Sequence, residues 1–233
     1  MARINRSELT KLEILRVAMK KFLEDGYTNT SVKAICNELD MSPGNLTFHF
    51  PTKEHLLVAM IEQLCSFQWQ LIQEEVEEGD TAVIAVCREL AFMVVMSEED
   101  AAIKDLFISA YSSPLCLEFI RKNDRERSKE IFKEYCSDWD EIRFREAEIL
   151  VSGIEYATLM TTGDPFSMEA RIHGALTQIL RIYNVPEELR RIKIEKVLSM
   201  DYRKIGHQVL LEFRKYVERS SEQALIGLLK GQE

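Results

Sequence analysis

Apolar residues recur at three- and four-residue spacing along almost the whole chain, which is the spacing of one face of an α-helix. Near the N-terminus, for example, Leu12, Leu15, Met19 and Phe22 follow this spacing, with basic residues between them. No run bounded by turn residues alternates between apolar and polar side chains, as a half-buried β-strand would. Only 5 prolines and 9 glycines occur in 233 residues, which favours long helices over a turn-rich sandwich or barrel. The sequence therefore predicts an all-α fold.

Turn and capping residues divide this pattern into segments. The first helix is expected to begin at Ser7 or Thr10, the latter in a capping box with Glu13, and to end at Gly26. Two very short helices are expected next, and breaks at Gly79-Asp80, at Ser112–Pro114, at Gly163–Pro165 and at Asn184–Pro186 separate the longer ones. The expected ranges are 31–39, 43–49, 53–78, 81–97, 99–111, 114–136, 141–161, 167–183, 186–199 and 201–229.

The stretch SPGNLTFHF at residues 42–50 has the features of a short helix that could read DNA. Ser42 is a natural N-cap, Pro43 suits the first helical position, and Phe50 precedes Pro51, which ends the helix. Together with the preceding helix it follows the helix-turn-helix plan, in which the second helix presents its N-terminal residues to the major groove. Leu46 and Phe50 are expected to point back into a three-helix core.

The remaining side chains of this helix are expected to face DNA. Gly44 allows close approach, and Asn45 can pair with adenine through two hydrogen bonds. Thr47 and His49 can donate to a phosphate or a base, and Phe48 can contact a thymine methyl. For His49, a catalytic or metal-binding role is the alternative, but no carboxylate or thiol lies at ligand spacing around it. Thr30 and Ser31 are expected to cap the second helix and to contact phosphate, and Lys33 to contact phosphate unless it lies on a solvated face.

The run ILRVAMKKFLEDGYTNTSVKAICNELDMSPGNLTFHFPTKEHLL resembles the N-terminal domain of TetR-type bacterial transcriptional repressors, over residues 12 to about 60. Lys53 matches a lysine that contacts phosphate in that family. Three positions depart from the family pattern. Asp40 stands where glycine is usual, Cys36 where alanine is common, and Thr47 where a tyrosine commonly reaches the phosphate backbone. An Asp can adopt the left-handed conformation that such a turn needs.

The resemblance implies a homodimer, an N-terminal DNA-binding domain at residues 1–52, and an effector-binding and dimerisation domain at 53–233, with helix 53–78 as the connector. It also implies that two of the last helices pack against a partner subunit, and that a small-molecule pocket lies between the body helices. Glu155 and His173 are polar residues within apolar stretches, so they are expected to orient a ligand or else to face solvent or the partner subunit. The full set of expected ligand contacts is Phe67, Trp69, Met93, Met96, Phe107, Tyr111, Trp139, Glu155, Tyr156, Met160 and His173, with plain core packing as the alternative for each apolar member.

Charge is unevenly distributed between the two expected domains. The net charge is −9, but residues 1–57 carry +1 and residues 58–233 carry −10. Because salt screens charges beyond about 8 Å, a locally basic surface can contact phosphate although the body is acidic. The charge distribution permits DNA binding but does not demonstrate it. The helix-turn-helix pattern and the family resemblance imply double-stranded operator DNA as the partner and a ligand-responsive repressor as the function.

The cysteine pattern and the lack of enzyme motifs narrow the remaining possibilities. The five cysteines are scattered, without CxxC spacing, which favours a reducing compartment over a disulfide framework or a zinc site. The most apolar stretch, 82–96, is too short to span a bilayer and contains Arg88-Glu89. No signal peptide, phosphate loop, HExxH or GxSxG occurs. We expect a cytoplasmic protein that is not an enzyme and has no catalytic residues, metal or cofactor. The alternative is a helical protein-interaction module without specific DNA binding.

Overall fold

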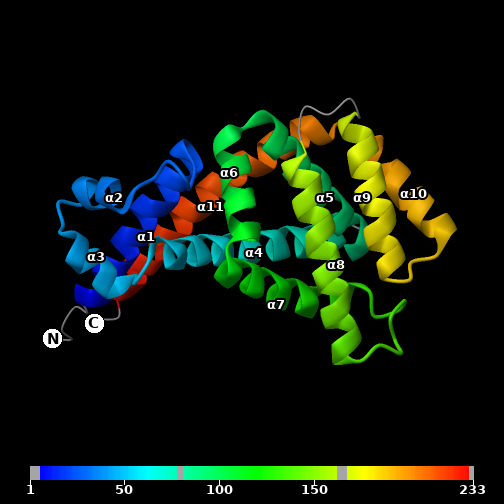
Figure 1. The fold of residues 1–233 in the computed structure, drawn as a ribbon, viewed down its shortest axis with the longest axis horizontal. Helices are drawn as coiled ribbons and strands as arrows, with labels where there is room; N and C mark the ends of the chain where they lie inside the picture. Colours follow the sequence, from blue (N-terminus) through cyan, green and yellow to red (C-terminus); the bar gives the residue numbers. More distant parts are fainter. Residues whose placement is uncertain (1–5, 78–80, 162–166, 231–233) are drawn as a thin grey trace.

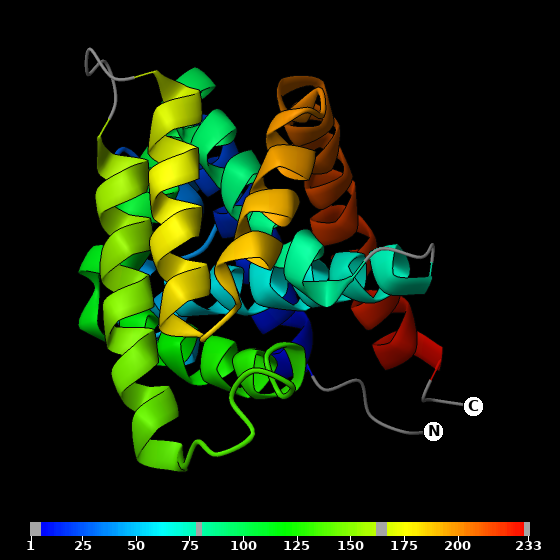
Figure 2. The same cartoon turned by 90° about the vertical axis from the view of Figure 1, so that its right-hand side faces the viewer.

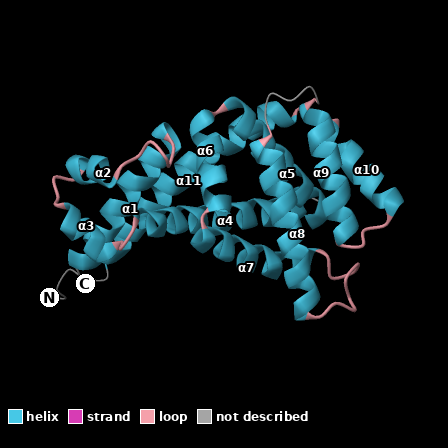
Figure 3. Cartoon of the chain, viewed as in Figure 1, coloured by secondary structure: helices cyan, strands magenta, loops and turns pink. Residues whose placement is uncertain are grey.

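The computed structural model describes residues 6–77, 81–161 and 167–230, of which 75–77 and 221–230 are described by their backbone alone. Within these ranges all the regular secondary structure is helical, so the all-α prediction is confirmed. Figure 3 shows these helices joined by short loops. The helices are α1 (Arg6–Asp25), α2 (Val32–Glu38), α3 (Pro43–His49), α4 (Lys53–Glu77), α5 (Ala82–Glu99), α6 (Ala101–Ser112), α7 (Pro114–Ile131), α8 (Glu141–Met160), α9 (Met168–Ile182), α10 (Glu187–Leu198) and α11 (Tyr202–Lys230).

The largest differences from the sequence-based expectation are at the start of α1 and the end of α7. The first helix already begins at Arg6, and the Thr10 hydroxyl donates to the Arg6 carbonyl at 2.9 Å, so neither Ser7 nor Thr10 is its N-cap. Helix α7 ends at Ile131 and not at residue 136. The ring of Phe132 stacks on Tyr183 at 4.1 Å, which fixes the chain just after α7 against α9. The expected breaks at Gly79-Asp80 and Gly163–Pro165 lie outside the described residues.

Helix α5 forms the centre of the body. Almost all of its side chains from Val83 to Ser97 are buried or half-buried, and it contacts α4, α6, α8, α9, α10 and α11. The near-continuous apolar sequence of this helix follows from that burial on all sides. Figure 2 shows α8 and α9 side by side along one edge of the molecule.

Helices α1–α3 form a small unit at one end of the molecule (Figure 1). Helix α4 leads away from this unit along the body, and α11 returns from the far side and packs against α1. Arg214 on α11 donates a hydrogen bond to the Leu23 carbonyl at 3.1 Å. Asp105 on α6 binds Thr28 in the loop between α1 and α2. The N-terminal unit is therefore attached to the body through three helices, and α4 is only one of them.

Candidate nucleic-acid interface and interior cavities

Helices α2 and α3 and the turn between them have helix-turn-helix geometry. The Ser31 side chain caps α2 by accepting from the Ala34 amide at 3.0 Å. Ser42 caps α3 by accepting from the Asn45 amide at 3.2 Å, and Pro43 follows it at the first helical position. Asp40 lies in the turn with φ of +49°, the left-handed conformation expected of it. Capping residues and one left-handed aspartate thus set the short turn.

Helix α3 has one anchored face and one free face. Leu46 is fully buried and Phe50 is 5% exposed, so both point into the core as expected. Phe48, by contrast, is 78% exposed. The Phe48 ring is therefore accessible to a partner on the free face of α3.

Most of the side chains expected to contact DNA lie on one accessible surface. His49 and Lys53 are half-buried, and His49 packs edge-on against the Phe48 ring at 5.2 Å. The exposed members are Ser31, Lys33, Ser42, Pro43, Gly44, Asn45, Thr47 and Phe48. The exception is Thr30, which is 2% exposed and donates its hydroxyl to the Gly26 carbonyl at 2.8 Å. Its side chain is a buried part of the α1–α2 connection and does not belong to this surface.

Two of these side chains are held by intramolecular contacts. The Thr47 hydroxyl donates to the Gly44 carbonyl at 3.2 Å, within its own helix. The ammonium group of Lys53 lies 4.1 Å from the centre of the Tyr27 ring. Burial lowers the pKa of Lys53 from its ordinary value, and the nearby Asp105 carboxylate opposes that shift. The cation–π contact therefore holds the charge of Lys53 at the start of α4, close to the end of α3.

Comparison with known proteins agrees with this geometry. Residues 14–60 match the family model of bacterial regulatory proteins of the tetR family. The HTH-type transcriptional regulator UidR of Escherichia coli K12 is 44% identical over 54 residues, which are 23% of this chain and 28% of UidR. The uncharacterized HTH-type transcriptional regulator YuxN of Bacillus subtilis is 31% identical over 80 residues, 34% of this chain and 28% of YuxN.

The N-terminal part of the chain thus has the helix-turn-helix domain of tetR-family regulatory proteins. The matches span less than a third of either relative's length, and the family-model match ends at residue 60, near the start of α4. No solved structure matches this chain. What the body does must be argued from its own side chains.

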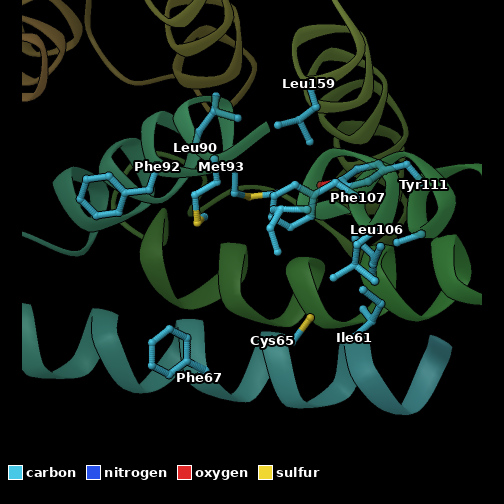
Figure 4. Packing of buried hydrophobic residues seen from close by; sticks show 14 of the residues in the cluster. Ile61, Cys65, Phe67, Leu90, Phe92, Met93, Leu106, Phe107, Tyr111 and Leu159 are labelled. Carbon is cyan, nitrogen blue, oxygen red and sulfur yellow. The ribbon is translucent and has the colours of Figure 1, made fainter. Parts of the chain in front are cut away.

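The body contains three adjoining small cavities. An apolar cavity of about 50 Å³ lies between α4, α5, α6 and α11, with Leu23 of α1 in its wall. Two others, of about 50 and 30 Å³, lie towards α7 and α8. Figure 4 shows Met93, Phe107 and Tyr111 above α4 in this region. Of the expected ligand contacts, those that line at least one of the three cavities are Phe67, Met93, Met96, Phe107, Tyr111 and Glu155.

The other expected ligand contacts lie elsewhere. Trp69 lines a separate outer groove between α4, α7 and α10. Trp139 and Tyr156 are half-buried and pack against Phe144 and Tyr111 respectively, without lining the three cavities. Met160 is 53% exposed, and His173 is exposed on α9. For His173, the alternative of facing solvent or a partner is the one that fits its position.

A cluster of ionisable side chains beside the second and third cavities was not expected. Its members are the carboxylates Glu89, Asp124, Glu148 and Glu155, together with Arg127. Only Glu155 had drawn attention in the sequence, because it interrupts an apolar stretch. Asp124 and Arg127 lie in RKNDRERSKE, where nearly every residue is charged, so no pattern distinguishes the buried members from the exposed ones.

Hydrogen bonds and one guanidinium group hold this acidic cluster together. Arg127 contacts both carboxylate oxygens of Glu89 and lies 3.3 Å from Asp124. Glu155 accepts from the Tyr111 hydroxyl at 2.9 Å. Glu148 accepts from Ser128 at 2.9 Å and from the Tyr183 hydroxyl.

Burial and mutual repulsion raise the carboxyl pKa values in the acidic cluster. Burial raises the pKa of Asp124 to about 6, with Arg127 opposing the shift. Burial, followed by the Asp124 charge, raises the pKa of Glu148 to about 7 and that of Glu155 well above its ordinary value. Among the described residues, no group of His, Cys, Asp or Glu has the arrangement to hold a metal ion. None of the helices in the same ranges is both long and apolar enough to cross a membrane.

Proposed function

We propose that this chain is a ligand-responsive transcriptional repressor that binds a palindromic operator as a homodimer and is released by a small-molecule effector. The observation that carries this proposal is the free face of α3, which presents Asn45, Thr47 and Phe48 to solvent while Leu46 anchors the helix from behind. This is the arrangement that places side chains at base edges in a major groove.

The proposed contacts divide into base readers and phosphate ligands. Asn45 is the best candidate for base readout, because an amide can pair with adenine through two hydrogen bonds. Lys33 on α2 and Lys53 at the start of α4 supply positive charge, and Ser31 and Thr47 supply hydroxyl groups. Phosphate contacts of this kind position the protein and make binding salt-dependent.

The surface of α8 and α9 is the proposed dimer interface. Ile142, Ile149, Leu150 and Met160 on α8 are 53–66% exposed, and an added Cβ at Gly153 would meet nothing within 4 Å. The same is true of Gly174 on α9. Exposed apolar residues and open glycines along two adjacent helices suit close packing against a second copy. Such a dimer would place two α3 helices in half-sites roughly 34–36 Å apart or slightly further.

Effector binding in the body is proposed to change that separation. Residues 1–52 would act as the DNA-binding domain and 53–233 as the effector and dimerisation domain, with α4 as the connector. Helix α6 offers a second route, because Phe107 lines the apolar cavity while Asp105 binds Thr28. An effector shifts the population towards the arrangement it binds better.

A gel shift with nonspecific competitor DNA tests the proposal, followed by footprinting of the fragment upstream of the protein's own gene. The expected result is a palindromic footprint. Uniform weak binding to every fragment, with no footprint, would contradict the proposal and favour the alternative of a helical protein-interaction module.

A further inference from the structure

The outer groove between α4, α7 and α10 is large enough to hold a small molecule. Its volume is about 580 Å³, whereas each of the three interior cavities has only about 30–50 Å³. Sites for small molecules commonly measure about 300–1,000 Å³, and one water molecule needs about 10–15 Å³. The groove therefore has room for an organic ligand, while the interior cavities have room for only a few waters.

Lys193 on α10 places a buried positive charge in the wall of this groove. It is only 9% exposed, and its ammonium group donates to the Thr81 hydroxyl at 3.0 Å. That hydroxyl is uncharged and already accepts from the Ile84 amide as the N-cap of α5. Among the side chains that the structure describes, no carboxylate lies within ion-pair distance of Lys193. Lysines are almost never buried to this extent without a partner, so the groove has a cation that lacks its anion.

The other charges of the groove lie at its rim. Glu130, Lys133 and Glu134, at the end of α7 and just beyond it, line the groove but are exposed. Water and salt screen exposed charges, so these three contribute little to the choice of a ligand. Lys193 is shielded from that screening, and its charge therefore decides which head group the groove prefers.

Trp69 on α4 gives the same groove an aromatic surface. The ring is half-buried, and the apolar side chains Ile72, Val83 and Ile131 line the groove with it. The guanidinium carbon of Arg127 lies 5.9 Å from the centre of the Trp69 ring, and this contact helps to hold the ring in place. A flat aromatic ligand gains ring stacking against such a surface in addition to the burial of apolar area.

We propose that the outer groove binds an aromatic carboxylate. Its carboxylate group would accept a hydrogen bond from Lys193, and its ring system would lie against Trp69. The ligand would link α10 to α4, the helix that begins at Lys53 beside the end of α3. Calling this acid the effector rests on the proposed function, whereas the binding site itself does not.

Calorimetric titration of the full chain with 2-naphthoate, 2-naphthamide and 2-naphthylmethylamine tests the head-group preference, because the three probes share one ring system. Near neutral pH they carry a negative, a zero and a positive charge. Naphthoate is expected to bind at least about tenfold more tightly than naphthamide, or about 1.4 kcal/mol, since a hydrogen bond between two charged groups is stronger than one to a neutral acceptor. The amine is expected to bind most weakly. Equal binding of naphthoate and naphthamide would overturn the proposal, and so would a preference for the amine.

Variants locate the site. Lys193→Met keeps the length of the side chain without its charge, so naphthoate affinity should fall about tenfold while naphthamide affinity stays within about twofold. Trp69→Leu should weaken both probes by the same factor, because both use the ring. Lys122→Met, at an exposed position of α7 outside the groove, is the matched control and should bind like the unmodified chain.

Lys133→Met separates the buried charge from the charge at the rim. It should leave most of the preference for naphthoate in place. Loss of that preference in Lys133→Met but not in Lys193→Met would overturn the assignment to Lys193. If Lys193→Met does not fold, the three-probe series on the unmodified chain and the Trp69→Leu variant still decide the question, and naphthoate affinity that Trp69→Leu leaves unchanged would overturn the site.

A gel shift with 2-naphthoate separates this inference from the proposed function. Binding of naphthoate without any change in operator affinity would support the groove as a binding site and contradict its use as the effector site. A specific footprint together with no preference for naphthoate would support the DNA-binding role and overturn the carboxylate site.

Discussion

Asp105 on α6 accepts two hydrogen bonds from Thr28, one from the backbone amide at 2.7 Å and one from the hydroxyl at 2.5 Å. The two residues are 77 positions apart in the sequence, and the contact joins the loop of the DNA-binding unit to the body. Gly26, in the same loop, has φ of +87°, and a Cβ there would lie 2.9 Å from the Asp105 carboxylate. The loop thus approaches α6 so closely that only glycine fits at this position.

Replacing Asp105 should loosen the DNA-binding unit. Asp105→Ala removes both acceptors, so we expect the free energy of unfolding to fall by about 1–3 kcal/mol. Chemical denaturation measures the change. Asp138→Ala, at an exposed site with one 4.0 Å contact to Arg143, is the control and should change stability by less than about 0.5 kcal/mol. Equal losses in the two variants would contradict a specific role for the Thr28 contact.

Lys53 is expected to contribute to all DNA binding alike. Lys53→Ala should weaken binding to specific and nonspecific fragments by the same factor, and should make the slope of log affinity against log salt shallower by about one. Fluorescence anisotropy across a salt series measures both. Lys133→Ala, an exposed lysine just beyond α7, should leave the slope unchanged. A Lys53 variant that lost only sequence preference would rule out the phosphate role.

Asn45 is expected to contribute to sequence discrimination. Asn45→Ala should cost about 1–3 kcal/mol on the preferred operator and relax the preference at one or two base pairs. Binding to a panel of single-base operator variants checks this. Asn37→Ala, on the exposed face of α2, serves as the control. An unchanged ranking of the panel would remove Asn45 from the set of base-reading residues.

The proposed dimer interface can be tested with a single charge. Ile149 is 54% exposed on α8, so Ile149→Asp should leave the folded subunit intact but place a charge inside the interface. We expect the dimer dissociation constant to rise by about a hundredfold or more, measured by analytical ultracentrifugation. Leu211→Asp, at a comparably exposed site on α11, should not affect assembly. If only Leu211→Asp caused the dimer to dissociate, the interface would have to be assigned to α11 and not to α8.

The raised pKa of Glu148 predicts a pH-dependent stability. A carboxyl group with a raised pKa binds more protons in the folded chain than in the unfolded one, so stability falls as pH rises from about 5 to 8. Glu148→Gln keeps an acceptor for Ser128 and Tyr183 and should flatten this fall by about 2–3 kcal/mol. The residual slope reflects the other groups facing it, namely Asp124, Glu155 and Arg127.

Thermal unfolding at several pH values measures this effect. Glu146→Gln, exposed on the same helix, is the control. The same pH slope in the Glu148 variant and the unmodified chain would show that the acidic cluster does not hold its protons at Glu148.

The sequence was most informative where local chemistry decides the structure. The start and end of α3 were predictable from Ser42, Pro43 and Phe50-Pro51, because caps and proline act within a few residues. The end of α7 was not predictable from the sequence, because the helix ends where Phe132 stacks on Tyr183, which lies 51 residues further along the chain. Helical periodicity contains no information about such a distant partner.

The residues around the cavities also divide into those that local sequence predicts and those that depend on distant contacts. Phe67, Met93, Met96 and Phe107, apolar residues at helical spacing, are buried and line the apolar cavity. Which side of α8 and of α9 is buried depends on the neighbouring helices. Residue spacing alone therefore could not predict that Met160 and His173 are exposed. The acidic cluster depends on three helices meeting, which no single segment reveals.

The return of α11 to α1 has a consequence for the order of events during synthesis. Leu23, near the end of the first helix, receives its hydrogen bond from Arg214, and Phe213 packs close by in the same apolar cavity. These α11 residues are synthesised about 190 positions after Leu23. Helix α1 can therefore complete its packing only after α11 has been made, so a product truncated before Arg214 would keep an N-terminal unit without this support.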